Sequence, residues 1–189
     1  QICLDPSVIL DGYSGGSGKI NVAKELILNN IKEHKILLFS QFTSVLAKLS
    51  VELEAENINY SYLDGSTSSK DRIKLVNEFN NKEDIRVFLI SLKAGGTGLN
   101  LTSADIVIHF DPWWNPAVED QATDRAHRIG QKNVVEVIKL IATGTIEEKI
   151  VELQDSKREL INQVLGDDLS VGSFINTLKE DEILNLFNY

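Results

Sequence analysis

The chain has 189 residues, 42% hydrophobic and 25% charged, which is typical of one compact domain with a single core. No run of about 18 apolar residues suggests a membrane span, and a single cysteine, Cys3, excludes an internal disulfide and fits a reducing, intracellular compartment. The formal charge of −9 argues at first against a nucleic-acid partner. However, residues 1–146 carry 15 basic and 18 acidic groups (−3), whereas residues 147–189 carry 4 and 10 (−6). The main body can therefore present a local phosphate-binding rim, although we expect weak DNA binding by itself.

Short runs rich in Ile, Val and Phe alternate with longer amphipathic stretches, which predicts an α/β fold with a mostly parallel sheet between helices. In chain order we expect a helix at 22–33, a strand at 36–39, a helix at 43–56, a strand at 60–63, a helix at 69–80, strands at 86–90 and 105–110, a helix at 117–129 and a strand at 134–141. A long amphipathic helix should follow and end near Gly166, with a short helix in the acidic tail. Right-handed crossovers would wind these elements into a doubly wound sheet.

Several helix ends carry capping signals. Asn115 can cap a helix whose first residue is Pro116, and Gly130 stands where a left-handed C-terminal residue belongs. Thr145 and Glu148 form a capping-box pattern ahead of the long helix.

The segment Gly12–Ile20, GYSGGSGKI, invites a Walker A interpretation and fails it. The pattern needs glycine at position 13 and a hydroxyl residue at position 20, where Tyr13 and Ile20 stand, so Mg²⁺ would lack its ligand. We therefore expect a flexible linker that caps the following helix. Asp181 and Glu182 lie in the charged tail rather than at a strand end, which argues against a Walker B role, and the three histidines show no metal or triad spacing.

The segment 121–131, QATDRAHRIGQ, is the most informative stretch of the chain. It places Gln121, Arg125 and Arg128 on the expected helix at spacings of four and three, so that their side chains share one face. Two arginines held in this way could stabilise the charge that develops on a γ-phosphate during phosphoryl transfer. The alternative is an exposed helix whose arginines form salt bridges with Glu119 and Asp124.

Two further groups of residues follow predicted strands. Gly95, Gly96 and Gly98 could let the backbone approach a phosphate, or could simply form a turn. Polar or small residues also follow the first two strands, where open α/β sheets gather ligand-binding loops; they could bind phosphate or, in the case of serine, cap a helix. These residues are Ser40, Gln41, Gly65 and Ser66.

The order of these segments resembles the Swi/Snf-related branch of helicase superfamily two. ILLFSQF, YLDGSTSSKDR, SLKAGGTGLNL, FDPWWNP and QATDRAHRIGQ occur in the order of that family's motifs four to six, and the resemblance covers residues 19–165. It implies a RecA-like, three-layer α/β/α second motor lobe with a C-terminal helical extension. Residues 1–18 would then be the end of an insertion between lobes and residues 166–189 an acidic helical tail, so we expect the chain to be part of a longer protein.

The resemblance also implies roles for individual residues. Arg125 and Arg128 would be the catalytic arginine fingers, while Gln121, Gly98 and Asn100 would bind ATP and couple it to DNA. DNA-backbone contacts would come from the residues Ser40, Gln41, Gly65, Ser66, Lys93, Ala94, Gly95 and Gly96. One of Trp113 and Trp114 would lie at the DNA or inter-lobe surface, although adjacent tryptophans on a loop can equally pack against the fold.

The function implied is that of half an ATP-dependent translocase on double-stranded DNA, which reads no base sequence. ATP and Mg²⁺ would be held mainly by a first lobe, without which this lobe should be inactive, and a DNA-bound protein complex is a further expected partner. The compartment would be the cytoplasm or nucleoid of a bacterium or the nucleus of a eukaryote. Two alternatives remain open, namely a non-catalytic RecA-like interaction module and a dinucleotide-dependent enzyme, the latter disfavoured because GxGxxG is missing from the first strand-to-helix turn.

Overall fold

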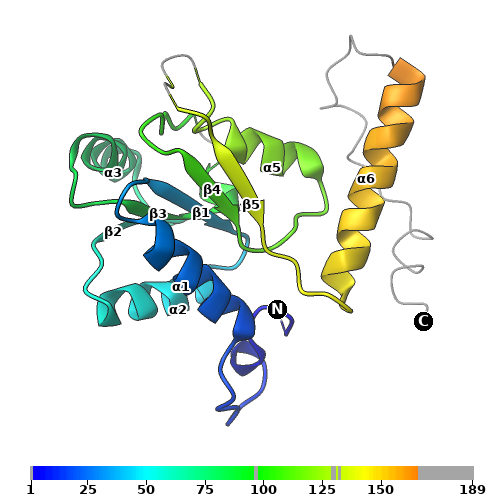
Figure 1. Cartoon of the computed structure of the whole chain (residues 1–189), viewed down its shortest axis with the longest axis horizontal. Coiled ribbons are helices and arrows are strands. Elements are labelled where there is room, and N and C mark those ends of the chain that lie inside the picture. The colour runs from blue at the N-terminus through cyan, green and yellow to red at the C-terminus, as the bar shows by residue number, and fades with distance from the viewer. Residues whose placement is uncertain (1, 96–97, 129–130, 132, 166–189) are drawn as a thin grey trace.

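The structure, a computed structural model, describes residues 2–95, 98–128, 131 and 133–165 (Figure 1). Its elements in chain order are η1 (Pro6–Val8), α1 (Gly18–Asn30), β1 (Ile36–Ser40), α2 (Thr43–Ala55), β2 (Tyr60–Leu63), α3 (Ser69–Asn81), β3 (Val87–Ser91), α4 (Leu92–Gly95), β4 (Ile106–His109), α5 (Pro116–Thr123), β5 (Glu136–Lys139) and α6 (Ile146–Leu165). All five predicted strands are therefore confirmed, with ends shifted by up to two residues.

The five strands form one sheet in the order β2-β3-β1-β4-β5, and every neighbouring pair is parallel. The central strand β1 is buried along its whole length, and its Leu38 lies between Leu89 of β3 and Ile108 of β4. A strand buried on both faces needs continuous apolar residues, as ILLF provides. The predicted α/β class with a parallel sheet is thus confirmed.

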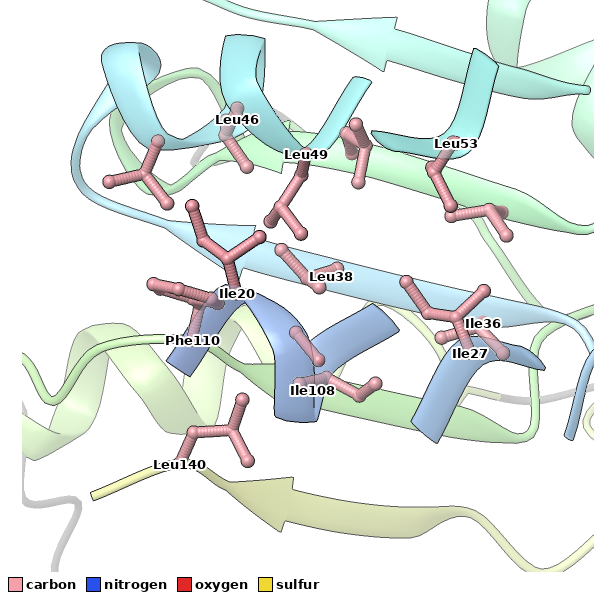
Figure 2. Packing of buried hydrophobic residues seen from close by; sticks show 14 of the residues in the cluster. Ile20, Ile27, Ile36, Leu38, Leu46, Leu49, Leu53, Ile108, Phe110 and Leu140 are labelled. Atoms are coloured by element: carbon pink, nitrogen blue, oxygen red, sulfur yellow. The ribbon is translucent and has the colours of Figure 1, made fainter. Parts of the chain in front are cut away.

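Helices cover both faces of the sheet and make three layers. On one face, Ile20 of α1 and Leu49 of α2 lie near Leu38 of β1, and Ile27 of α1 lies beside Ile36 of the same strand (Figure 2). On the other face, Phe79 of α3 packs with alternate strand residues and with the short α4 and α5. Each fully buried aliphatic or aromatic side chain of these two clusters contributes about 1.5–3 kcal/mol.

Two helix starts differ from the sequence expectation. Helix α1 begins at Gly18 rather than Val22, because the hydroxyl of the N-cap residue Ser17 accepts a hydrogen bond from the Ile20 N–H (3.1 Å). The end of the expected linker is therefore helical. At α6, Thr145 Oγ1 accepts from the Glu147 N–H (3.2 Å), but the Glu148 carboxylate reaches back to the Gly144 N–H (2.9 Å), one residue before the expected partner.

Candidate functional site

The site is built at the edge of the sheet where the strands end. Because all strands are parallel, the segments that follow them leave from this one edge. Ser40 at the end of β1 pairs with Ser91 at the end of β3, and Leu63 at the end of β2 pairs with Ile90. The loops after β1, β2 and β3, which contain the residues expected to contact DNA apart from the tryptophans, are thereby brought together, although the segments are far apart in the sequence.

The loop after β1 is organised by a buried carboxylate, Asp111, that follows β4. Ser40 is fully buried and its hydroxyl donates a hydrogen bond to Asp111, which also accepts from the Gln41 N–H (3.1 Å). Burial raises the pKa of Asp111 to about 6, against the lowering effect of these hydrogen bonds. A phosphate contact from the Ser40 hydroxyl would require its bond to Asp111 to break, whereas Gln41 remains half-exposed.

The loop after β2 presents Gly65 and Ser66 to solvent. The Asp64 carboxylate accepts hydrogen bonds from the N–H (2.9 Å) and hydroxyl (2.6 Å) of Ser66, and these bonds lower the pKa of Asp64. Ser68, rather than Ser66, caps α3 by accepting from the Asp71 N–H (3.2 Å). Ser66 is therefore not used as a cap and its loop stays outside the helix.

The segment after β3 begins with the short helix α4. Lys93 is exposed, Ala94 is buried at 2%, and Gly95 ends the helix. Gly98 has φ +47°, the left-handed region that favours glycine, and open space surrounds the position of a Cβ. Asn100 is exposed, and its carbonyl accepts a hydrogen bond from Asn80 of α3 (2.8 Å). The prediction for Gly96 lies outside the described residues.

The expectation that Gln121, Arg125 and Arg128 share one helix face is wrong. Helix α5 ends at Thr123, so only Gln121 is helical, and it is exposed. Past Thr123 the backbone tightens, with the Arg125 N–H bonding the Ala122 carbonyl (3.2 Å) and the Ala126 N–H the Thr123 carbonyl (3.0 Å), while the Arg125 carbonyl accepts from the Leu101 N–H (3.0 Å). The predicted cap at Gly130 lies outside the described residues.

The two arginines nevertheless lie near each other. Arg125 is only 3% exposed, while Arg128 is exposed and its Nε donates to the Asp124 carbonyl (3.3 Å). Burial lowers the pKa of Arg125, the positive charge of Arg128 lowers it further, and Asp124 opposes both. The arrangement is therefore one buried and one exposed guanidinium, close enough to interact, directly after α5.

The double-tryptophan loop is held by a buried acid that the sequence analysis did not identify as functional. Glu119 of α5 is 1% exposed; its Oε1 accepts the Trp113 N–H (2.6 Å) and its Oε2 pairs with Lys139 of β5 (2.5 Å). Gln154 of α6 donates to the Trp113 carbonyl and to Glu119 (3.2 Å). Trp113 packs partly on the core, and Trp114 lines a hollow of about 140 Å³.

Helix α6 is fixed to the body at its first turn as well. Lys19 of α1 pairs with Glu147 (2.5 Å), and both side chains are buried. Burial lowers the pKa of Lys19 despite this partner.

Asn115 caps α5 by accepting from the Ala117 N–H (3.0 Å), with Pro116 as the first helical residue, as the sequence predicts.

Two of the three histidines, His109 and His34, have structural surroundings. His109 is buried, stacks on Phe39 and lies 3.0 Å from the Thr123 hydroxyl through its Nε2; burial lowers its pKa to about 4. His34 lies 3.0 Å from a carboxylate oxygen of Asp105. Within the described ranges, three or more His, Cys, Asp or Glu side chains nowhere gather as a metal site would require. Nor is any described helix long and apolar enough to cross a lipid bilayer.

Comparison with known proteins identifies the family to which this fold belongs. Residues 18–130 match the family model described as the helicase conserved C-terminal domain. An uncharacterized ATP-dependent helicase of Mycoplasma pneumoniae is 45% identical over 177 residues, and the human chromatin-remodeling ATPase INO80 is 42% identical over 173 residues. The matches cover 93% and 90% of this chain but only 17% and 11% of those proteins, so the chain spans a small part of their length.

Solved structures agree with the sequence relatives. The C-terminal part of the Fun30 ATPase domain superposes with a TM-score of 0.73 at 39% identity, covering 90% of this chain and 52% of that one. The Sulfolobus solfataricus SWI2/SNF2 ATPase core in complex with dsDNA superposes with a TM-score of 0.72 at 39% identity, covering 87% and 35%. The chain therefore belongs to the helicase conserved C-terminal domain family, as the C-terminal, RecA-like lobe of a Swi/Snf-type helicase.

Proposed function

We propose that this lobe is the second half of an ATP-driven translocase on double-stranded DNA. It would contact the DNA backbone through the loops at the strand ends and deliver Arg125 and Arg128 to ATP held by a first lobe. The observation that carries the proposal is the hydrogen bond from the Leu101 N–H to the Arg125 carbonyl (3.0 Å). It joins the segment that follows the expected DNA-contacting residues 93–96, at the residue after Asn100, to the segment expected to contact nucleotide.

This bond gives the proposed coupling a physical route. A change at a bound phosphate that moves Arg125 would displace the backbone at Leu101, next to Asn100 and close to Gly98. Gly98 has a left-handed backbone conformation that few other residues adopt without strain. A side chain at this position would therefore alter the backbone of the loop that leads to Leu101. Gln121, exposed on α5 a few residues before the arginines, would lie toward the nucleotide.

The chemistry of the arginines suits a nucleotide phosphate. Guanidinium groups bind phosphate oxygens with charge-assisted, bidentate hydrogen bonds, and a buried one is weakly screened by water. When bound, ATP with Mg²⁺ would supply the phosphoryl group for hydrolysis. We assign ATP and Mg²⁺ mainly to the first lobe, with Arg125 and Arg128 approaching the phosphates from this one. Catalysis would then require the two lobes to close.

The DNA contacts would be to the phosphate backbone alone. Exposed Gly65, Ser66 and Lys93 offer backbone N–H groups, a hydroxyl and an ammonium, which bind phosphate and read no base. Half-exposed Gln41 lies at the same edge, and the DNA-bound state of the Sulfolobus relative supports this choice of partner. Few cations lie here and the chain carries −9 overall, so the isolated lobe should bind DNA weakly. Movement of the complete two-lobed protein along DNA could then remodel a protein complex bound to that DNA.

The decisive experiment compares ATP hydrolysis by the full-length protein and its Arg125→Ala and Arg128→Ala variants, with and without duplex DNA. We expect DNA-stimulated kcat to fall about 10³-fold or more, with the DNA concentration for half-stimulation changed less than about twofold. Arg86→Ala, at the opposite edge of the sheet, serves as the control. Undiminished turnover in both arginine variants would instead favour a non-catalytic interaction module. Strong hydrolysis by residues 1–189 alone would contradict the half-motor.

A further inference from the structure

Arg72, which the sequence analysis did not single out, lies between two of the loops described above. It is a half-buried residue of α3. Its Nε donates to the Thr67 carbonyl (3.0 Å) and its Nη2 to the Asp64 carbonyl (3.3 Å), both in the loop after β2. Its Nη1 donates to the Ala94 carbonyl (3.1 Å) in α4. A single guanidinium thus bridges the loop after β2 and the helix after β3.

The loop after β2 is closed on itself by hydrogen bonds between its own residues. The Asp64 N–H donates to the Thr67 hydroxyl (3.1 Å), and the Asp64 carboxylate accepts from Ser66. At its apex Gly65 is exposed, with open space around the position of a Cβ. The position of this loop relative to α4 must therefore be set by residues outside the loop. Arg72 contacts the loop at two of its carbonyls.

Arginine suits this role because its guanidinium is planar, always charged and carries donors in a fixed fork. Hydrogen bonds from a charged donor are about twice as strong as neutral ones, so three of them hold the carbonyls in a defined arrangement. Helix α4, only four residues long, has little stability of its own and gains from such an anchor. The separation between Gly65 with Ser66 and exposed Lys93 would consequently be set by one side chain.

We propose that Arg72 is a positioning residue that fixes the spacing between two phosphate-binding elements, so that both contact the backbone of one DNA duplex together. The inference rests on the proposed function and adds to it. With the spacing fixed, the second phosphate contact forms without a further ordering cost, which raises affinity for any duplex regardless of sequence. Arg72 acts through the loops and does not itself touch phosphate.

The test uses the full-length protein with Arg72→Gln, Arg72→Lys and Arg86→Gln. Arg86 is a matched control, since it is also half-buried and donates to the Glu83 carbonyl (3.1 Å), the Lys32 carbonyl (2.9 Å) and the Glu83 carboxylate (3.2 Å). It stands just before β3, at the other edge of the sheet. Both glutamine variants lose one charge and a similar set of bonds, so a general loss of stability should affect them alike in thermal melting.

We expect Arg72→Gln to raise the duplex concentration that half-stimulates ATP hydrolysis about tenfold, with kcat at saturating DNA within about twofold of wild type. Arg72→Lys, which keeps the charge and part of the bonding, should fold as wild type and raise it about threefold; it carries the test if Arg72→Gln unfolds. Arg86→Gln should leave the value unchanged. The slope of log affinity against log salt should be the same for wild type and Arg72→Lys.

Three results would overturn the inference. Unchanged half-stimulation in both Arg72 variants would remove the positioning role while leaving the proposed function intact. A salt slope that falls by about 0.9 in Arg72→Gln would identify Arg72 as a direct phosphate ligand instead. Absence of DNA stimulation in the wild-type protein would overturn the proposed function, and this inference with it.

Discussion

Replacing Asp111 by asparagine tests whether the site contains a carboxylate whose ionisation is disfavoured by folding. Asp111 is 1% exposed, and its partners are the Ser40 hydroxyl and the Gln41 N–H. Asparagine has the same shape, and its side-chain oxygen and nitrogen can bond to the same two groups. The substitution therefore removes a titratable group with little change in packing.

The expected magnitude follows from the pKa of Asp111, which folding raises from 3.8 to about 6. The folded state therefore holds a proton that the unfolded state releases, and the free energy of unfolding falls as pH rises through this window. At about 1.36 kcal/mol per pKa unit the whole effect is about 3 kcal/mol, of which about 1 kcal/mol falls between pH 5.2 and 7.5. In the Asp111→Asn variant the free energy of unfolding should not show this decrease with pH.

Urea denaturation of residues 1–189 at several pH values between 5.2 and 7.5 measures the effect. The sequence pI is about 4.8, and this range avoids the low solubility expected there. Buried His109, whose pKa is lowered to about 4, acts in the opposite direction, because the unfolded state then binds the extra proton and stability rises with pH. The difference between wild type and Asp111→Asn cancels the His109 contribution. Parallel pH profiles for the two proteins would refute the reasoning.

Two further substitutions probe packing. Glu119→Ala should lower the free energy of unfolding by about 2 kcal/mol, since the Trp113 N–H loses its acceptor; exposed Asp120→Ala on the same helix is the control, and equal losses would contradict the role. Phe79→Ala should cost about 3–5 kcal/mol because the side chain is fully buried, whereas Ile73→Ala on the same helix, 64% exposed, should cost less than about 0.5 kcal/mol. Urea denaturation measures both, and a similar cost for Phe79→Ala and Ile73→Ala would show that α3 does not pack as described.

The sequence by itself predicted the elements of the sheet and several helix ends. Strands such as 36–39 and 86–90 are recognisable because a strand buried on both faces needs a continuous apolar run, which is a local property of the chain. The Asn115 cap with Pro116 is local in the same sense, since its hydrogen bond spans two residues. The order of the motifs likewise predicted the family.

The tertiary structure alone decided the geometry within the site. Helix α5 stops at Thr123, and the Arg125 carbonyl beyond it accepts a hydrogen bond from Leu101 in another loop, a distant donor that helical periodicity does not report. The burial of Asp111 and Glu119, and their hydrogen bonds and ion pairs, likewise depend on residues distant in the sequence. Their partners Ser40 and Lys139 come from other strands, and the free energy of a buried charge depends on everything packed around it rather than on neighbours in the chain.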